Sequence, residues 1–261
     1  ANSRLSASRA LAETGGPALA GSLIQWLTPV GATIGDALSY LISAFCLGQV
    51  RHREPPPQAS PGAFWHELGA GWRMLWGNAT MRALTLAAVT RNLGGGAFAA
   101  LYILYLLREL SISPVVLGLL FSVGGVGGLA GALLAPALAR RWRVARLLRW
   151  MVLANAICAG LTPVAGATLV PLLPMVAQGC GGITDVLCDI YGARLVAGTI
   201  SPDALGRVLG TSRLLAQAAL PLGALLGALA SAHVGLRVVL VGAAVVLILA
   251  TLWLMRLPDA A

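Results

Sequence analysis

Residues 115–138, VVLGLLFSVGGVGGLAGALLAPAL, decide the fold class of this chain. None of these 24 residues is charged, and the polar side chains amount to one serine. A spanning α-helix needs about 20 mostly apolar residues, because each residue advances the helix axis by about 1.5 Å through a hydrocarbon layer about 30 Å thick. The stretch therefore predicts a helix that crosses a membrane.

The rest of the 261 residues repeats this composition. Hydrophobic residues make up 58% of the chain and charged residues 10%, and the mean hydropathy is +0.83. Such a composition is too apolar for a water-soluble globule. We expect an all-α integral membrane protein with eight transmembrane helices, at residues 10–27, 32–50, 83–107, 115–138, 147–165, 168–193, 208–232 and 234–255.

The residue inventory argues against an enzyme. All 18 basic residues are arginine, which excludes chemistry that needs a lysine amine, such as a P-loop or a Schiff base. The histidines are scattered and the cysteines lie singly, so we expect no metal site and no cofactor. The glycines within residues 124–131 do not lie between a strand and a helix, as those of a phosphate loop would. They therefore favour close helix packing.

The net charge of +9 follows membrane topology and does not indicate a nucleic-acid partner. Arg91 lies inside an expected span, and Arg108 and Arg237 fall on one face of the membrane. The other 15 arginines fall on the opposite face, which the positive-inside rule makes cytoplasmic. We expect a multi-pass protein in the lipid bilayer of the cell membrane, with both ends of the chain cytoplasmic. The 15 residues are Arg4, Arg9, Arg51, Arg53, Arg73, Arg82, Arg140, Arg141, Arg143, Arg146, Arg149, Arg194, Arg207, Arg213 and Arg256.

An internal repeat indicates a duplicated architecture. Shifting the sequence by 204 residues aligns the first two expected spans with the last two, so that Pro17 meets Pro221. We therefore expect residues 1–50 to be the last two helices of an amino-terminal half and residues 80–256 the complete six-helix carboxy-terminal half of a twelve-helix transporter. The chain is then a carboxy-terminal fragment that lacks four amino-terminal helices.

The linker between these halves, residues 51–79, should lie in the cytoplasm. Its apolar residues from Phe64 to Trp76 recur at helical spacing after a proline-rich run. An amphipathic helix of this kind is expected to lie flat on the inner membrane interface.

Four motifs at the ends of the expected spans carry a family resemblance. They are SRALAE at 8–13 running into GPALAG at 16–21, DALSYL at 36–41, LARR at 138–141, and PD at 202–203 followed by GRV at 206–208. Together they resemble the major facilitator superfamily, and within it the drug and siderophore exporters of the macrolide and enterobactin efflux type. The resemblance implies a rocker-switch carrier whose third and sixth spans in this chain line a central cavity.

Ionisable side chains inside the expected spans are the candidates for proton coupling or ion pairing. An ionised side chain in hydrocarbon costs about 2.5–3.5 kcal/mol on insertion scales, so each one requires a partner or a wet cavity. Arg91 lies nine residues after the arginine that starts its span, and Asp185 nine residues before the arginine that ends its span, so both should lie about 13 Å deep. The candidates are Asp185, Arg91, Asp189 and Glu13.

We expect Arg91 and Asp185 to pair across the cavity, with Asp185 as the proton-coupling candidate. A purely structural ion pair that fixes helix packing accounts equally well for their shared depth. Asp189 is shallower, and we interpret it as part of a gate or an interface salt bridge rather than as a proton carrier.

Polar and aromatic residues along the two cavity helices suggest a substrate surface. Gln178 lies on the same face of its helix as Asp185, seven residues before it. Phe98, Tyr102 and Tyr105 form a stripe with Arg91 that either stacks an aromatic or lipophilic substrate or belongs to ordinary packing, with Tyr105 in an outer aromatic belt. The substrate-cavity candidates are Asn92, Phe98, Tyr102, Gln178 and Gln217.

Two further features have alternative interpretations. Arg9 and Arg213 occupy equivalent places in the repeat and are candidates for a cytoplasmic gate, although Arg9 with Glu13 also has the spacing of a simple surface pair. The three glycines at 94–96 either loosen the third span or permit a tight helix crossing.

These observations predict a secondary active transporter, in particular a proton-coupled efflux carrier for a lipophilic drug-like or siderophore-like small molecule. Its expected partners are that substrate, protons, the lipid bilayer and the missing amino-terminal helices. A six-helix half needs its mate to form a central pathway, so the chain alone should be inactive. The alternative is a membrane sensor without transport activity, or a truncated and inactive relic of a transporter.

Overall fold

The computed structural model describes residues 34–49, 63–164, 172–200 and 202–257. Within these ranges every regular segment is helical, as the sequence predicts for this fold class. The helices are Ile34–Gly48 and then α2 (Ala63–Gly77), α3 (Ala79–Arg108), α4 (Pro114–Arg141), α5 (Val144–Val164), α6 (Leu172–Thr199), α7 (Pro202–Val234) and α8 (Leu236–Leu254).

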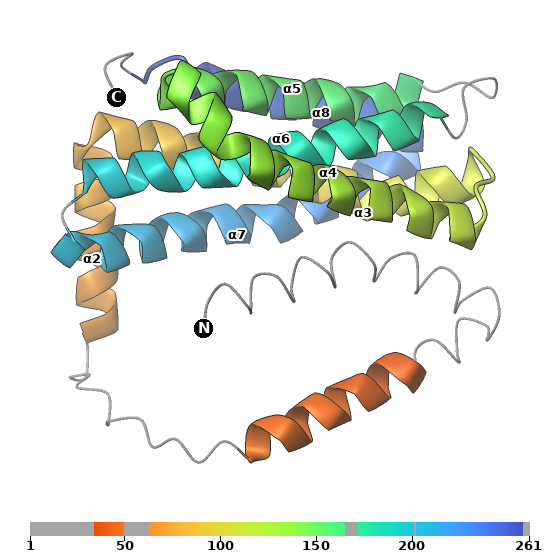
Figure 1. Cartoon of the computed structure of the whole chain (residues 1–261), viewed down its shortest axis with the longest axis horizontal. Coiled ribbons are helices and arrows are strands. Elements are labelled where there is room, and N and C mark those ends of the chain that lie inside the picture. Colours follow the sequence, from red (N-terminus) through yellow and green to blue (C-terminus); the bar gives the residue numbers. More distant parts are fainter. Residues whose placement is uncertain (1–33, 50–62, 165–171, 201, 258–261) are drawn as a thin grey trace.

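Helices α3 to α8 run side by side along the long axis of the molecule, and α2 lies across one end of them (Figure 1). Local signals set where some of them begin. The side chain of Asn78 accepts hydrogen bonds from the first turn of α3, and Ser113 caps α4, whose first residue is Pro114. Gly235, with φ of 85°, makes the sharp turn between α7 and α8.

Among the residues that the structure describes, four helices are long and apolar enough to cross a membrane by length and composition: α4, α5, α8 and the Gly206–Val234 part of α7. The helix Ile34–Gly48 is apolar but shorter, and the first expected span, residues 10–27, lies outside the described residues. Helices α3 and α6 are 30 and 28 residues long, and charged residues and amides interrupt their apolar character. These polar residues mark α3 and α6 as helices that do more than contact lipid.

The six long helices pack with an internal symmetry. Helix α3 packs against α7 and α8, whereas α6 packs against α4 and α5, and α5 contacts α8. If α3, α4 and α5 are exchanged with α6, α7 and α8 in that order, the contacts of α3 become those of α6, and the contact of α5 with α8 is unchanged. This is the packing expected of two inverted three-helix repeats.

Glycines make the closest helix crossings. A methyl group on Gly96 of α3 would collide with the carbonyl oxygen of Leu220 in α7, and one on Gly127 of α4 would collide with the carbonyl oxygen of Gly179 in α6. Helix α3 continues without interruption through residues 94–96. Of the two interpretations of these glycines, the tight crossing is therefore the one that the structure supports.

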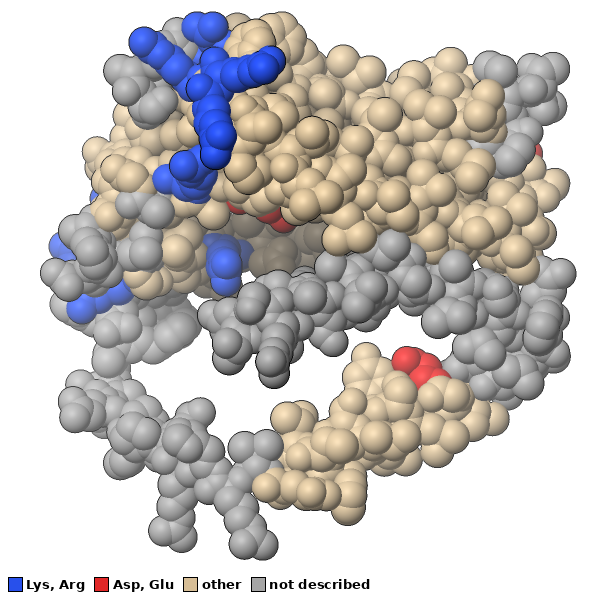
Figure 2. Space-filling view, viewed as in Figure 1, with Lys and Arg blue, Asp and Glu red and all other residues tan. Residues whose placement is uncertain are grey.

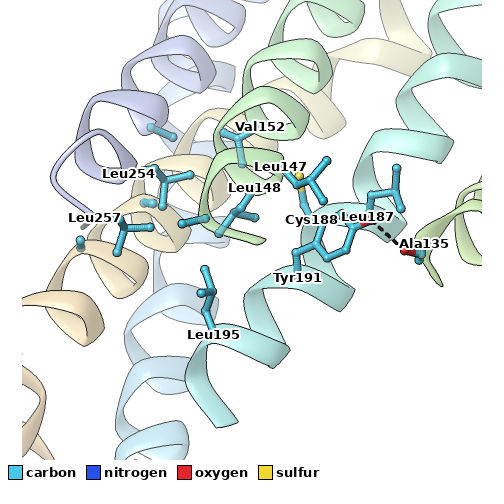
Figure 3. Packing of buried hydrophobic residues seen from close by; sticks show 14 residues of the cluster. Ala135, Leu147, Leu148, Val152, Leu187, Cys188, Tyr191, Leu195, Leu254 and Leu257 are labelled. Carbon is cyan, nitrogen blue, oxygen red and sulfur yellow. Dashed lines mark hydrogen bonds between the residues drawn. The ribbon is translucent and has the colours of Figure 1, made fainter. Parts of the chain in front are cut away.

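A hydrophobic cluster joins α5, α6 and α8 near the end of the bundle where α2 lies. Figure 3 shows the members of this cluster, among them Leu147 and Leu148 of α5 and Leu187 and Tyr191 of α6. The Tyr191 ring is completely buried, and its hydroxyl donates a hydrogen bond of 3.1 Å to the carbonyl oxygen of Ala135 in α4. The cluster holds the outer helices against α6 and so fixes the position of its polar residues.

The amphipathic helix expected in the linker is present as α2. Its Leu75 is buried against Met81 and Val208, while Trp72 and Trp76 are exposed and lie 5.6 Å apart between ring centroids. Gly71 lies directly against the side chain of Thr211 in α7. Helix α2 is thus anchored to the bundle by its small and aliphatic residues and keeps its tryptophans outside.

Arginines gather at the end of the bundle where α2 lies, over α4 and α5 (Figure 2). Arg108 and Arg237 are at the opposite end, where α3 ends and α8 begins. The described arginines at the rich end are Arg73, Arg82, Arg140, Arg141, Arg143, Arg146, Arg149, Arg194, Arg207, Arg213 and Arg256.

Candidate functional site

Three charged side chains meet between α3 and α6. The guanidinium nitrogen Nη2 of Arg91 lies 3.4 Å from Oδ1 of Asp185 and 3.2 Å from Oδ1 of Asp189, to which it donates a hydrogen bond. The expected contact between Arg91 and Asp185 is therefore present. Asp189 joins it because the two aspartates are one helical turn apart on the same face of α6.

The group Arg91, Asp185 and Asp189, the charged triad below, is unevenly exposed. The side chain of Arg91 is 24% exposed, whereas those of Asp185 and Asp189 are 58% and 76% exposed. An arginine stays protonated in proteins, so the triad with both carboxylates ionised has a net charge of −1. It can accept one proton or one cationic group without leaving the arginine unpaired.

The triad borders a cavity of about 640 Å³ between the helices. Arg91 and Asp185 line it, and Figure 2 shows acidic side chains at the edge of a hollow on this face of the molecule. Much of the wall is glycine, which leaves room where side chains would otherwise stand. The lining glycines are Gly95, Gly124, Gly125, Gly128, Gly181 and Gly182.

Three of the expected substrate-cavity residues line this cavity: Asn92, Phe98 and Gln178. The side chain of Asn92 also donates hydrogen bonds to the carbonyl oxygen of Ala216, at 2.7 Å, and to Oε1 of Gln217, at 3.4 Å. Asn92 thus ties α3 to α7 next to the triad. Gln217 is exposed on α7 and is not among the residues that line the cavity, but it is hydrogen-bonded to Asn92, which is.

The two tyrosines of α3 lie deeper than the sequence stripe suggests. Tyr102 is 4% exposed and packs behind the cavity wall, stacked on Phe98 with ring centroids 5.1 Å apart and edge-on to Phe121 at 6.0 Å. Tyr105 is 2% exposed within the same hydrophobic cluster. Its assignment to an outer aromatic belt is therefore wrong, because α4 and α8 cover this face of α3.

Helix α5 contributes polar residues that the sequence analysis did not single out. Asn155 lines the cavity and donates hydrogen bonds to the carbonyl oxygen of Gly181, at 3.3 Å, and to the hydroxyl of Thr184, at 3.2 Å. Thr162 also lines the cavity. A single asparagine within the apolar span 147–165 was the available signal, because an amide in hydrocarbon needs a partner just as a charge does.

Of the two cytoplasmic gate candidates, Arg9 and Arg213, the described residues include Arg213. Arg9 and Glu13 lie outside the described residues. Arg213 is exposed near the start of α7, at the arginine-rich end of the bundle.

Comparisons with known proteins agree with this architecture. A family model described as transmembrane secretion effector, one of the major facilitator superfamily models, matches residues 4–260. An uncharacterized transporter of the major facilitator superfamily type, y4rN of Sinorhizobium fredii, is 28% identical over 221 residues, which cover 80% of this chain and 51% of that protein. The chain spans about half the length of this curated relative.

Proposed function

Since the chain belongs to the transmembrane secretion effector family of the major facilitator superfamily, we propose that it is the carboxy-terminal part of a twelve-helix secondary transporter. The transporter exports a lipophilic drug-like or siderophore-like small molecule in exchange for protons. The observation that carries this proposal is the charged triad at the border of a cavity of about 640 Å³.

The triad supports proton coupling through its charge balance. Two carboxylates share one guanidinium, so the uptake of one proton brings the triad from −1 to neutral and lowers the cost of holding it in a low-dielectric cavity. Asp185 is the better placed of the two aspartates to exchange a proton with the cavity, because Asp185 lines the cavity and Asp189 is not among its lining residues.

The cavity supports a substrate with an apolar or aromatic body. Its volume is within the range of about 300–1,000 Å³ typical of small-molecule sites. Phe98 and Phe121 offer aromatic rings on one side, and Asn92, Asn155 and Gln178 offer amides that can orient polar groups. The preceding helices of the transporter would complete the opposite wall.

The distribution of arginines supports an orientation in the membrane. The arginine-rich end with α2 lies in the cytoplasm by the positive-inside rule, and the end with Arg108 and Arg237 faces outward. Both ends of the chain are then cytoplasmic in the cell membrane, and α2 rests on the inner interface through Trp72 and Trp76.

The test is dye export from bacterial cells that lack their own efflux pumps. The cells express residues 1–261 together with the coding sequence upstream of them, and fluorescence of a lipophilic dye reports its export with and without a protonophore. We expect export that depends on the proton gradient, and residues 1–261 alone to be inactive. Asp185→Asn should lower coupled export by about fivefold to 150-fold, the range that corresponds to coupling free energies of about 1–3 kcal/mol.

Glu109→Gln is the matched control, because it removes an acidic charge that lies at the end of α3 and outside the cavity. It should leave export unchanged. Equal export by Asp185→Asn would remove the coupling role of Asp185, whereas dye binding without any export by the longer protein would favour the membrane sensor.

A further inference from the structure

A second cavity, of about 550 Å³, lies between the first turns of α5 and the last turns of α8. It shares no lining residue with the cavity that borders the charged triad. Its lining combines two arginines with apolar and aromatic side chains. The residues are Trp142, Arg146, Arg149, Trp150, Leu153, Thr251 and Met255.

The helical spacing of these residues separates a charged level from an apolar level. Arg146, Arg149, Trp150 and Leu153 stand at i, i+3, i+4 and i+7 on one face of α5. Leu153 is therefore about 10 Å farther along the helix axis than Arg146. The groove runs from two guanidinium groups at the end of the bundle toward an aliphatic surface nearer its middle.

The charged level attracts anions. The two guanidinium groups of the groove, those of Arg146 and Arg149, stand about one helical turn apart near the start of α5. Figure 2 shows arginine side chains gathered at this end of the molecule. Guanidinium groups bind phosphate through paired N–H donors, so the groove is complementary to a phosphate-bearing headgroup.

The apolar level distinguishes a lipid from a soluble anion. Trp142, Trp150 and Met255 are 51%, 58% and 66% exposed, on helices that are apolar and long enough to span a membrane. Tryptophan is enriched at the membrane–water interface, where its ring lies beside headgroups and acyl chains. A free phosphate has no apolar part that could contact these side chains, whereas the glycerol backbone and acyl chain of a lipid would cover them.

We propose that this groove is a binding site for a phospholipid with a net negative headgroup. The headgroup phosphate lies on Arg146 and Arg149, and one acyl chain follows Trp150 and Leu153 along α5. The lipid bridges α5 and α8 on the outside of the bundle, so the site is independent of transport through the cavity at the triad.

The test is native mass spectrometry of the detergent-purified protein titrated with phosphatidylglycerol, phosphatidylethanolamine or inorganic phosphate. We expect saturable binding of phosphatidylglycerol in preference to phosphatidylethanolamine. Because each arginine near an anionic lipid contributes about 1 kcal/mol, the double variant R146Q/R149Q should weaken phosphatidylglycerol binding by about 10-fold to 30-fold.

The matched control is R140Q/R141Q, which removes the same charge from the same end of the bundle but leaves the groove intact. It should change phosphatidylglycerol binding by less than about threefold. The proposal is wrong if the two double variants weaken binding equally, if R146Q/R149Q has no effect, or if inorganic phosphate displaces the lipid. It is also wrong if the arginines instead hold a second copy of the chain, seen as a dimer that R146Q/R149Q abolishes.

Discussion

Gly95 and Gly96 are neighbours in α3, yet they belong to two different regions of the molecule. Gly96 lies in the crossing with α7, where the carbonyl oxygen of Leu220 occupies the place of a side chain. Gly95 lines the cavity, and no atom lies within 4 Å of the point where its Cβ would stand. Gly96 permits backbone contact and Gly95 leaves open space in the cavity, so the same residue type closes a helix crossing at one position and widens a cavity at the next.

Gly96→Leu should have the largest effect, because the new side chain cannot enter the α3–α7 crossing without separating the helices. We expect little or no folded protein after purification in detergent, measured as the monodisperse fraction on size-exclusion chromatography. Gly95→Leu is the control and should yield folded protein at the level of the original chain. A well-folded Gly96→Leu with an unchanged melting temperature would contradict the crossing.

Helix α4 offers the same comparison with smaller substitutions. Gly127→Ala should destabilise the protein by about 1–3 kcal/mol, because its methyl group would meet the backbone of Gly179. Gly124→Ala meets Gln178 at an ordinary contact distance of 3.5 Å and should be neutral or more stable by up to about 1 kcal/mol from its helix propensity. Melting temperatures in one detergent compare the two, and equal losses would show that the α4–α6 packing differs from this structure.

Gly95→Leu should have the smallest effect on the fold and a selective effect on ligands. The added side chain projects into the cavity and displaces about two methylene groups of a bulky substrate, each worth about 0.8 kcal/mol, so affinity should fall by about tenfold to fifteenfold. A small dye should bind as before. Binding titrations with dyes of increasing size measure this difference, and a uniform loss for all sizes would mean that Gly95 does not face the ligand.

The sequence predicted much of the polar site because burial of charge is costly wherever it occurs. Two residues at equal depth from opposite helix ends, Arg91 and Asp185, were expected to meet and do meet. A gate or an interface salt bridge was expected for Asp189, but not that its partner would be Arg91, because the depth of a residue along its helix does not say how far an arginine side chain reaches. Asn155 was not predicted, because a single uncharged amide within an apolar span is a weaker signal than a charge.

The sequence by itself determined that the chain is helical, that it is suited to a membrane and that its arginines collect at one end. These properties follow from composition and local periodicity, which do not depend on the partner of any helix. Only the tertiary structure decided which face of each helix is covered: Phe98 lines the cavity and Tyr102, one turn later, lies behind it. The side chains of successive helix residues point in directions about 100° apart. The neighbouring helices set the rotation of each helix about its own axis, and a small change in that rotation decides whether a residue lines the cavity or packs in the core.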